Sequence, residues 1–145
     1  MSELYVTEGS ASNWQEAIQL ASQELIKNHC VTDDFYESCV EREKEYPTGL
    51  TEICPVAIPH TTKEHVTRQS ISVVRLTHPV KFHSMEDMDK EIDVQIVMNL
   101  ALLNDDEHIV IIQKLINGLK EEDFIHKLLT LPVDELKELL EKTLN

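Results

Sequence analysis

The feature that most constrains the fold is a nearly continuous apolar run at residues 92–103. Its apolar side chains are Val94, Ile96, Val97, Met98, Leu100, Ala101 and Leu102. A strand with one face in water alternates apolar and polar residues, whereas a strand covered on both faces does not. We therefore predict that this run forms the central strand of a sheet, with helices packed on both of its faces.

Other segments supply the rest of the predicted sheet. β-Branched residues and alternation predict strands at residues 4–6, 56–58 and 71–76. Residues 80–82 predict a short edge strand, because Pro79 limits how this segment pairs. The polar residues 83–90 are expected to form a connecting loop.

Helical patterns lie on either side of the strand-rich middle. Ser12 is expected to cap the first helix, with Gln15 in the capping-box position, and Asp33 or Asp34 to cap the second. The second helix should stop before the loop at residues 46–49. A third helix should begin near residues 104–106 and bury the stripe Ile109, Ile112, Leu115, Ile116 and Leu119.

A short helix at about residues 121–129 and a final helix from Pro132 complete the chain. The final helix should bury Leu136, Leu139, Leu140 and Leu144. The sequence thus predicts one α/β domain over residues 1–145, in which helices sandwich a mixed β-sheet.

Charge and hydropathy restrict the partners and the location. The chain has 27 acidic and 13 basic residues and a net charge of −14, which argues against nucleic acid or an anionic membrane as the main partner. No apolar run approaches the ~20 residues that a membrane helix needs, so direct membrane insertion is not expected. The opening Met1-Ser2-Glu3 lacks a secretion signal, and we expect a cytoplasmic protein.

Cysteine and glycine usage excludes several kinds of site. Cys30, Cys39 and Cys54 form no C-x-x-C pair, so we expect small reduced side chains rather than a zinc or redox site. The three glycines are scattered, which excludes the glycine-rich nucleotide loops. We therefore expect no bound cofactor.

Two of the seven histidines lie where binding sites form in open α/β sheets. His60 follows Pro59, which should end a short strand. His108 falls in the first turn of the helix after the longest strand. The remaining five have ordinary surface explanations, and Glu64-His65 does not extend to the H-E-x-x-H pattern of zinc hydrolases. A histidine-rich metal binder is an alternative for which the ligand spacing is missing.

Six segments in order resemble a known family. They are CVEREKEYPTGL at residues 39–50, VAIPHT at 56–61, SISVVRL at 70–76, PVKF at 79–82, IDVQIVMNLAL at 92–102 and DDEHIVIIQKL at 105–115. Together they resemble the enzyme IIA domain of the bacterial sugar phosphotransferase system, fructose/mannitol class. The loop at residues 46–50 is most similar to galactitol-type members.

The resemblance implies a phosphocarrier and assigns its site. His60 would accept a phosphoryl group at Nε2 from the histidine-containing phosphocarrier protein, HPr, and pass it to a cysteine of enzyme IIB, which feeds the membrane component enzyme IIC. His108 and Arg42 would stabilise the phosphoryl group, and Thr61 or Thr62 would support it. A backbone carbonyl bonded to Nδ1–H of His60 would leave Nε2 free to attack.

Two functions remain open for such a chain. The first is uptake and phosphorylation of a sugar or hexitol. The loop at residues 46–50, similar to that of galactitol-type members, favours a substrate like galactitol. The second is a regulatory module that signals through phosphorylated His60. The sequence names neither the sugar nor the oligomeric state.

Overall fold

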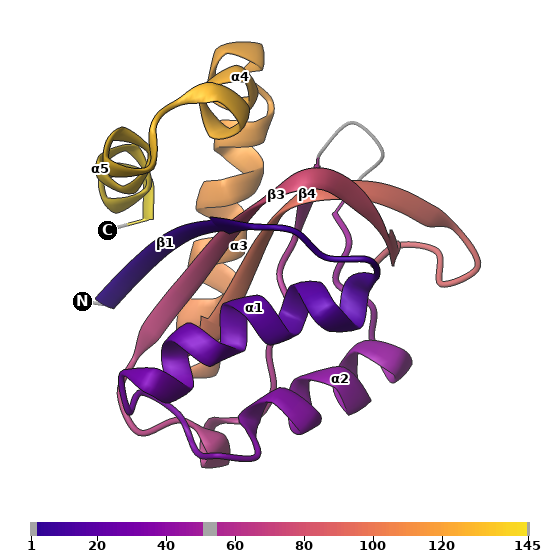
Figure 1. Ribbon diagram of the computed structural model, residues 1–145, viewed down its shortest axis with the longest axis vertical. Coiled ribbons are helices and arrows are strands. Elements are labelled where there is room, and N and C mark those ends of the chain that lie inside the picture. Colours follow the sequence, from indigo (N-terminus) through magenta and orange to yellow (C-terminus); the bar gives the residue numbers. More distant parts are fainter. Residues whose placement is uncertain (1–2, 51–54, 145) are drawn as a thin grey trace.

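A mixed sheet forms the middle layer of the structure, a computed structural model that describes residues 3–50 and 55–144 (Figure 1). The strands are β1 (Glu3–Gly9), β2 (Val56–Ala57), β3 (Ser70–His83) and β4 (Glu91–Ala101). Over these residues their order is β1-β3-β4-β2, with β1 parallel to β3, β3 antiparallel to β4, and β2 parallel to β4. Strand β4 is thus an inner strand, as its apolar run predicts.

Helices cover both faces of this sheet. Helices α1 (Trp14–Lys27) and α2 (Phe35–Glu45) lie on one face, and α3 (Asp105–Leu119), α4 (Glu122–Thr130) and α5 (Val133–Leu144) lie on the other (Figure 1). A short 3-10 turn, η1 (Lys63–His65), follows β2. The described residues therefore form the single α/β sandwich that the sequence predicts.

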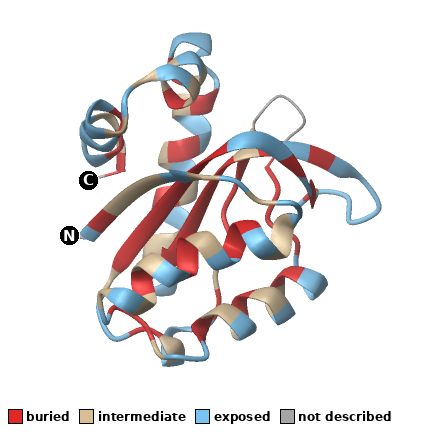
Figure 2. Ribbon diagram, viewed as in Figure 1, coloured by how far each residue is buried: buried red, intermediate tan, exposed pale blue. Residues whose placement is uncertain are grey.

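Each face of the sheet has its own hydrophobic core. Ile96, Met98 and Leu100 of β4 pack with α3, α4 and α5, whereas Val97 and Ala101 pack with α1 and α2. Figure 2 shows the buried residues concentrated in β3, β4 and the inner faces of the helices. The predicted inward residues of α5 are confirmed: Leu136, Leu140 and Leu144 are buried, and Leu139 is partly buried against the core. Helix α1 buries Ala17, Ile18, Ala21 and Leu25, and its Trp14 is partly buried.

The prediction of a separate edge strand at residues 80–82 was wrong. These residues continue β3, a single strand of 14 residues. The register with β4 shifts between Arg75 and Val80, so Pro79 falls in a bulge and no ladder hydrogen bond requires its missing N–H.

The cap of α1 is Asn13 rather than Ser12. Asn13 Oδ1 accepts a hydrogen bond from Glu16 N at 2.9 Å, and Glu16 Oε1 accepts one from Ser12 N at 2.8 Å. Asparagine is as good a cap as serine, and Glu16 then occupies the third helical position where a capping carboxylate is favoured. The cap therefore lies one residue later than the predicted pair of Ser12 and Gln15.

The predicted buried stripe of α3 was partly wrong. Ile109 and Ile116 are 57% and 42% exposed, while Ile111, Leu115 and Leu119 are buried and Ile112 is partly buried. Apolar residues occur on several sides of this helix, so periodicity alone permits two faces, and packing with α4 and α5 selects one of them.

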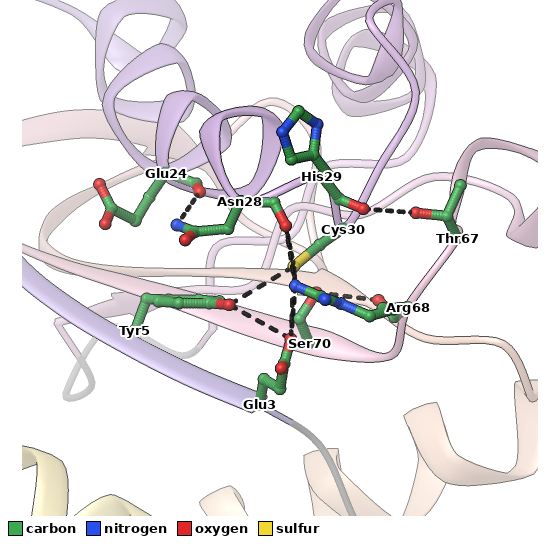
Figure 3. A network of polar contacts seen from close by, with 9 residues as sticks. All are labelled: Glu3, Tyr5, Glu24, Asn28, His29, Cys30, Thr67, Arg68 and Ser70. Atoms are coloured by element: carbon green, nitrogen blue, oxygen red, sulfur yellow. Dashed lines mark hydrogen bonds and ion pairs between the residues drawn. The ribbon is translucent and has the colours of Figure 1, made fainter.

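A polar cluster fastens the start of β1 to the turn after α1 (Figure 3). The Arg68 guanidinium forms an ion pair with Glu3 at 3.2 Å and donates to the carbonyl of Asn28 at 2.8 Å. Tyr5 Oη donates to Glu3 at 3.2 Å, beside the buried thiol of Cys30. Cys30 and Cys39 are both buried and unpaired, whereas Cys54 lies outside the described residues.

Gly49 holds the loop after α2 against the end of β3. Its N–H donates to the carbonyl of His83 at 3.1 Å, and its own carbonyl accepts from Met85 N at 2.8 Å. A Cβ at this position would lie 2.6 Å from His83 O and 2.8 Å from Ile92 Cδ1. Only glycine allows this approach of two backbones.

We therefore expect Gly49→Ala to lower the free energy of unfolding by about 1–3 kcal/mol, the usual cost of overpacking. Urea denaturation measures this loss. Gly9→Ala is the matched control, because a Cβ there would meet the end of the Leu20 side chain at 3.1 Å, which can move aside. Equal midpoints for the two variants would contradict the steric argument.

Candidate active site

His60 lies just beyond β2, held by β4 on one side and by the loop after α2 on the other. Pro59 O accepts a hydrogen bond from Leu100 N at 3.0 Å, and His60 forms a parallel bridge with Leu100. Ile58 N donates to Thr48 O at 3.2 Å. The backbone at His60 is therefore fixed although β2 itself spans only Val56–Ala57.

The imidazole of His60 is oriented by the segment that directly precedes it. Its Nδ1 lies 2.9 Å from the carbonyl oxygen of Ile58. A carbonyl oxygen can only accept a hydrogen bond, so Nδ1 carries the proton. Nε2 then has the free lone pair, which is the arrangement that the sequence analysis expects of a nucleophilic histidine.

His108 lies beside His60, as its position after β4 predicts. The two rings have centroids 4.8 Å apart and are tilted by 40°. His108 belongs to the first turn of α3, whose cap Asn104 accepts a hydrogen bond from Asp106 N at 2.8 Å. Its Nε2 is buried and has no hydrogen-bond partner among the described residues.

Arg42 reaches the same place from the opposite helical layer. Its guanidinium carbon lies 5.2 Å from the ring centroid of Tyr46, and its Nε is buried without a partner in the described parts of the chain. Burial of an unsatisfied donor costs free energy, so this N–H is a candidate ligand for an anion.

The three side chains share a cavity of about 470 Å³, which Thr61, Thr62 and Lys63 also line. A second cavity of about 260 Å³ shares Arg42 and His60 and is lined in addition by Tyr46, Met85 and Met88. His60 and Arg42 therefore border both hollows, and the site is open to a large partner.

The two threonines occupy different positions. Thr61 is buried, and its hydroxyl lies 2.5 Å from Ser38 Oγ of α2, so it ties the His60 segment to the helix that carries Arg42. Thr62 is exposed and its side chain is hydrogen-bonded to Glu64. Both hydroxyls are therefore engaged with the protein.

Burial dominates the electrostatics of the histidine pair. It lowers the pKa of His60 to about 4, and the nearby His108 and Arg42 act in the same direction, against the opposing effect of the hydrogen bond to Ile58. Burial also lowers the pKa of His108, with Arg42 contributing and Asp105 opposing. Both rings are consequently neutral at pH 7.

Sequence reasoning gave no role to Glu43, which stands next to Arg42. Its carboxylate is buried and accepts hydrogen bonds from Thr48 N and Thr48 Oγ1, both at 2.8 Å. Glu43 therefore shapes the turn from α2 into the loop that contacts Ile58. The sequence signal for Glu43 was its place beside Arg42 in the family motif at residues 39–50. No role followed from that signal, because most glutamates in a charged helix face water.

The other histidines lie elsewhere. His29, His78, His83 and His126 are exposed, as expected, and His65 Nδ1 contacts Asp34 at 3.1 Å. Across residues 3–50 and 55–144, no group of three or more His, Cys, Asp or Glu side chains is arranged to hold a metal ion. Within the same residues, no helix is long and apolar enough to cross a membrane.

Comparison with known proteins decides the family. Residues 2–143 match the family described as "Phosphoenolpyruvate-dependent sugar phosphotransferase system, EIIA 2". The chain belongs to this family. It is a phosphotransferase component of the sugar phosphotransferase system, as the resemblance of its motifs indicates.

Individual relatives agree with this assignment. The galactitol-specific EIIA component of Escherichia coli K12 is 30% identical over 144 residues, which cover 98% of this chain and 95% of the relative. The mannitol-specific EIICBA component of the same strain is 34% identical over 135 residues, 90% of this chain and 20% of the relative.

Among solved structures, the complex of mannitol enzyme IIA with phosphorylated mannitol enzyme IIB from E. coli matches with a TM-score of 0.77. The identity is 30%, and the match covers 97% of this chain and 94% of that one.

We expect the ring of His60 to titrate far below an ordinary histidine. NMR titration of its ring resonances should give a midpoint near pH 4, because the imidazolium loses hydration in the buried site. His60 would then remain a neutral nucleophile over the whole range in which an ordinary histidine, with a pKa near 6.5, becomes charged. A midpoint near 6.5 would contradict this view of the site.

Glu43 should make the free energy of unfolding depend on pH. Burial raises its pKa to about 7, so the folded protein binds this proton more tightly than the unfolded chain. Its contribution is therefore greatest below pH 4.5 and is lost as the pH rises through about 7. As the pH rises through this range, the urea denaturation midpoint of Glu43→Gln should not fall. The midpoint of Glu37→Gln, an exposed change on the same helix, should fall as in the wild type.

Proposed function

We propose that this protein is a phosphocarrier in which His60 accepts a phosphoryl group from phosphorylated HPr and transfers it to a cysteine of enzyme IIB. The observation that carries the proposal is the environment of the His60 ring. Nδ1–H is bound to a carbonyl, which leaves the Nε2 lone pair for attack, and the same cavity is lined by Arg42 and His108, whose Nε and Nε2 have no partner among the described residues.

The first transfer needs no cofactor. The Nε2 lone pair of His60 attacks phosphorus and forms a new N–P bond, while the N–P bond of the donor breaks and its electrons return to the donor imidazole. The His60 ring gains positive charge in this step. That charge is stabilised by the bond from Nδ1–H to Ile58 O, which strengthens as the ring becomes cationic.

The oxygens of the transferred group carry the negative charge, so positioned donors lower the barrier. Arg42 supplies Nε–H and the guanidinium charge. His108, in the tautomer with its proton on Nε2, supplies a second donor. Both donors lack protein partners among the described residues, and they need not break an existing bond in order to bind a phosphoryl oxygen.

In the second transfer, His60 is the donor of the phosphoryl group. A cysteine thiolate of enzyme IIB attacks the same phosphorus, and the N–P electrons return to Nε2, which restores neutral His60. The low pKa of His60 favours this release, because its burial disfavours the cationic ring. The mannitol enzyme IIA to which this chain is similar forms a complex with phosphorylated enzyme IIB, which supports the same partner here.

The carrier acts in the cytoplasm as part of a hexitol uptake system. Enzyme IIC is the membrane component of this system and follows enzyme IIB in the transfer chain. A galactitol-specific relative covers nearly the whole chain, and mannitol-specific relatives follow. These sugar-specific relatives favour uptake over the regulatory alternative.

Acidic residues border the site and suit a basic docking partner. Asp105 and Asp106 are exposed beside His108, and the chain carries a net charge of −14. Opposite charges raise association rates without requiring a large contact. This is the contact expected of a carrier that must bind and release two partners in turn.

The test is phosphoryl labelling from phosphoenolpyruvate through enzyme I and HPr. We expect His60→Ala to abolish labelling. Arg42→Ala and His108→Ala should slow single-turnover transfer by about 10²- to 10³-fold, the usual effect of removing one charge-stabilising donor. Addition of enzymes IIB and IIC with a hexitol should then yield the sugar phosphate from the wild-type protein.

The matched control is His78→Ala, which removes an exposed histidine from β3. It should be labelled at the wild-type rate. Full labelling of a folded His60→Ala protein would refute the proposed acceptor, and unchanged rates in both Arg42→Ala and His108→Ala would refute their roles.

A further inference from the structure

A buried polar chain runs from α1 through β4 to the peptide that precedes His60. Ser22 Oγ donates to Asn99 Oδ1 at 2.7 Å, and Asn99 Nδ2 donates to Pro59 O at 3.0 Å. Both Ser22 and Asn99 are 0% exposed. Polar groups in an apolar core cost free energy unless they are satisfied, so a complete network at this depth calls for an explanation.

The carbonyl of Pro59 is the point at which the network meets the site. This carbonyl lies in the same peptide plane as the N–H of His60. Proline has no N–H, so the segment has one ladder donor fewer than an ordinary strand. Pro59 O instead receives two donors from β4, Leu100 N and Asn99 Nδ2, each at 3.0 Å.

Pro59 O fixes which way the Asn99 amide faces, and Ser22 binds the other end of that amide. A carboxamide has an accepting end and a donating end, and either could face Pro59. Because the Pro59 carbonyl can only accept, Nδ2 is directed to Pro59 O, with the Cys39 thiol 3.6 Å away, and the Ser22 hydroxyl donates to Oδ1. A flipped amide would place two oxygens face to face.

The same network touches the helix that carries Arg42. Cys39 is on α2, three residues before Arg42, and Ser38 of α2 binds the Thr61 hydroxyl just after His60. The peptide on each side of His60 is thus tied to a different element: Pro59 to β4 and Thr61 to α2.

We propose that Asn99 is a positioning residue for phosphoryl transfer: anchored at Oδ1 by Ser22, Asn99 sets the Pro59–His60 peptide plane and through it the place of the His60 ring. The inference rests on the proposed function. A tilt of this peptide would change the 2.9 Å contact of Nδ1 with Ile58 O and the 4.8 Å separation from the His108 ring.

The test uses two variants and two measurements on the full chain. Asn99→Leu retains similar volume but removes the amide, and Ser22→Ala removes only the hydroxyl that anchors the amide oxygen. The ring ¹⁵N shifts of His60 report the share of the Nδ1–H tautomer, and single-turnover labelling by phospho-HPr reports the transfer rate.

We expect Asn99→Leu to lower the transfer rate by about 10- to 100-fold, the cost of a small misplacement of a reacting group. Ser22→Ala should slow transfer by less. Both should increase the share of the other His60 tautomer.

Ser72→Ala is the matched control. Ser72 is directly opposite Asn99 on β3, and its buried hydroxyl has no partner among the described residues. This variant should keep the wild-type rate and tautomer, so any loss of stability alone is separated from loss of positioning.

Wild-type rate and tautomer in a folded Asn99→Leu protein would overturn the proposal. If Asn99→Leu does not fold, Ser22→Ala decides, and its equivalence to Ser72→Ala in both measurements would overturn it as well. The tautomer is read without any partner protein. Failure of phospho-HPr to label the wild type would therefore count against the proposed function, while the ¹⁵N shifts still decide the role of Asn99.

Discussion

The pairing of β4 with the segment around Pro59 is the interaction on which the rest of the site depends. Strand β4 is parallel to β2, so both run toward the same edge of the sheet. His60 follows β2 at this edge, and α3 starts here with His108 in its first turn. One strand thereby places both rings, His60 through hydrogen bonds and His108 through chain continuity. This edge is where open α/β sheets generally form their binding sites.

The third member of the site comes from the other side of the sheet. Arg42 lies near the end of α2, which packs with α1, whereas His108 lies on α3, in the opposite layer. The site therefore joins two helical layers around the end of the sheet. Glu43 fixes the turn beside Arg42 through Thr48. Arg42 Nε and His108 Nε2 have no hydrogen-bond partner within the described chain, and their burial costs stability. In the proposed function, this cost keeps two donors ready for an anion.

The sequence predicts the layers because those depend on strong local patterns, whereas the pairing of His60 with His108 and the role of Arg42 were implied by the resemblance to a known family. An apolar run without alternation identifies β4, and the Pro59–His60 pair identifies a strand end. The errors occur where tertiary contacts choose between near-equal local options. Asn13 and Ser12 are both good caps, and α3 has apolar residues on more than one side. Glu43 was missed because most helical glutamates face water, although its partner Thr48 is only five residues further on. Asn99 could not be found locally, because only the fold brings its partners near. The Ser22–Asn99 contact joins residues 77 positions apart.

In the proposed mechanism, a proton and a phosphoryl group compete for the same nitrogen, Nε2 of His60. Burial and the nearby Arg42 and His108 all disfavour a proton on His60. A phosphoryl group is different, because it brings its own negative charge to the position where these neighbours present donors. The environment that lowers the pKa of the ring therefore favours an N–P bond over an N–H bond. The same burial disfavours the cationic ring of phosphorylated His60, so the phosphoryl group remains easy to pass on. A carrier needs this balance, since a strongly stabilised phosphohistidine would hold its cargo.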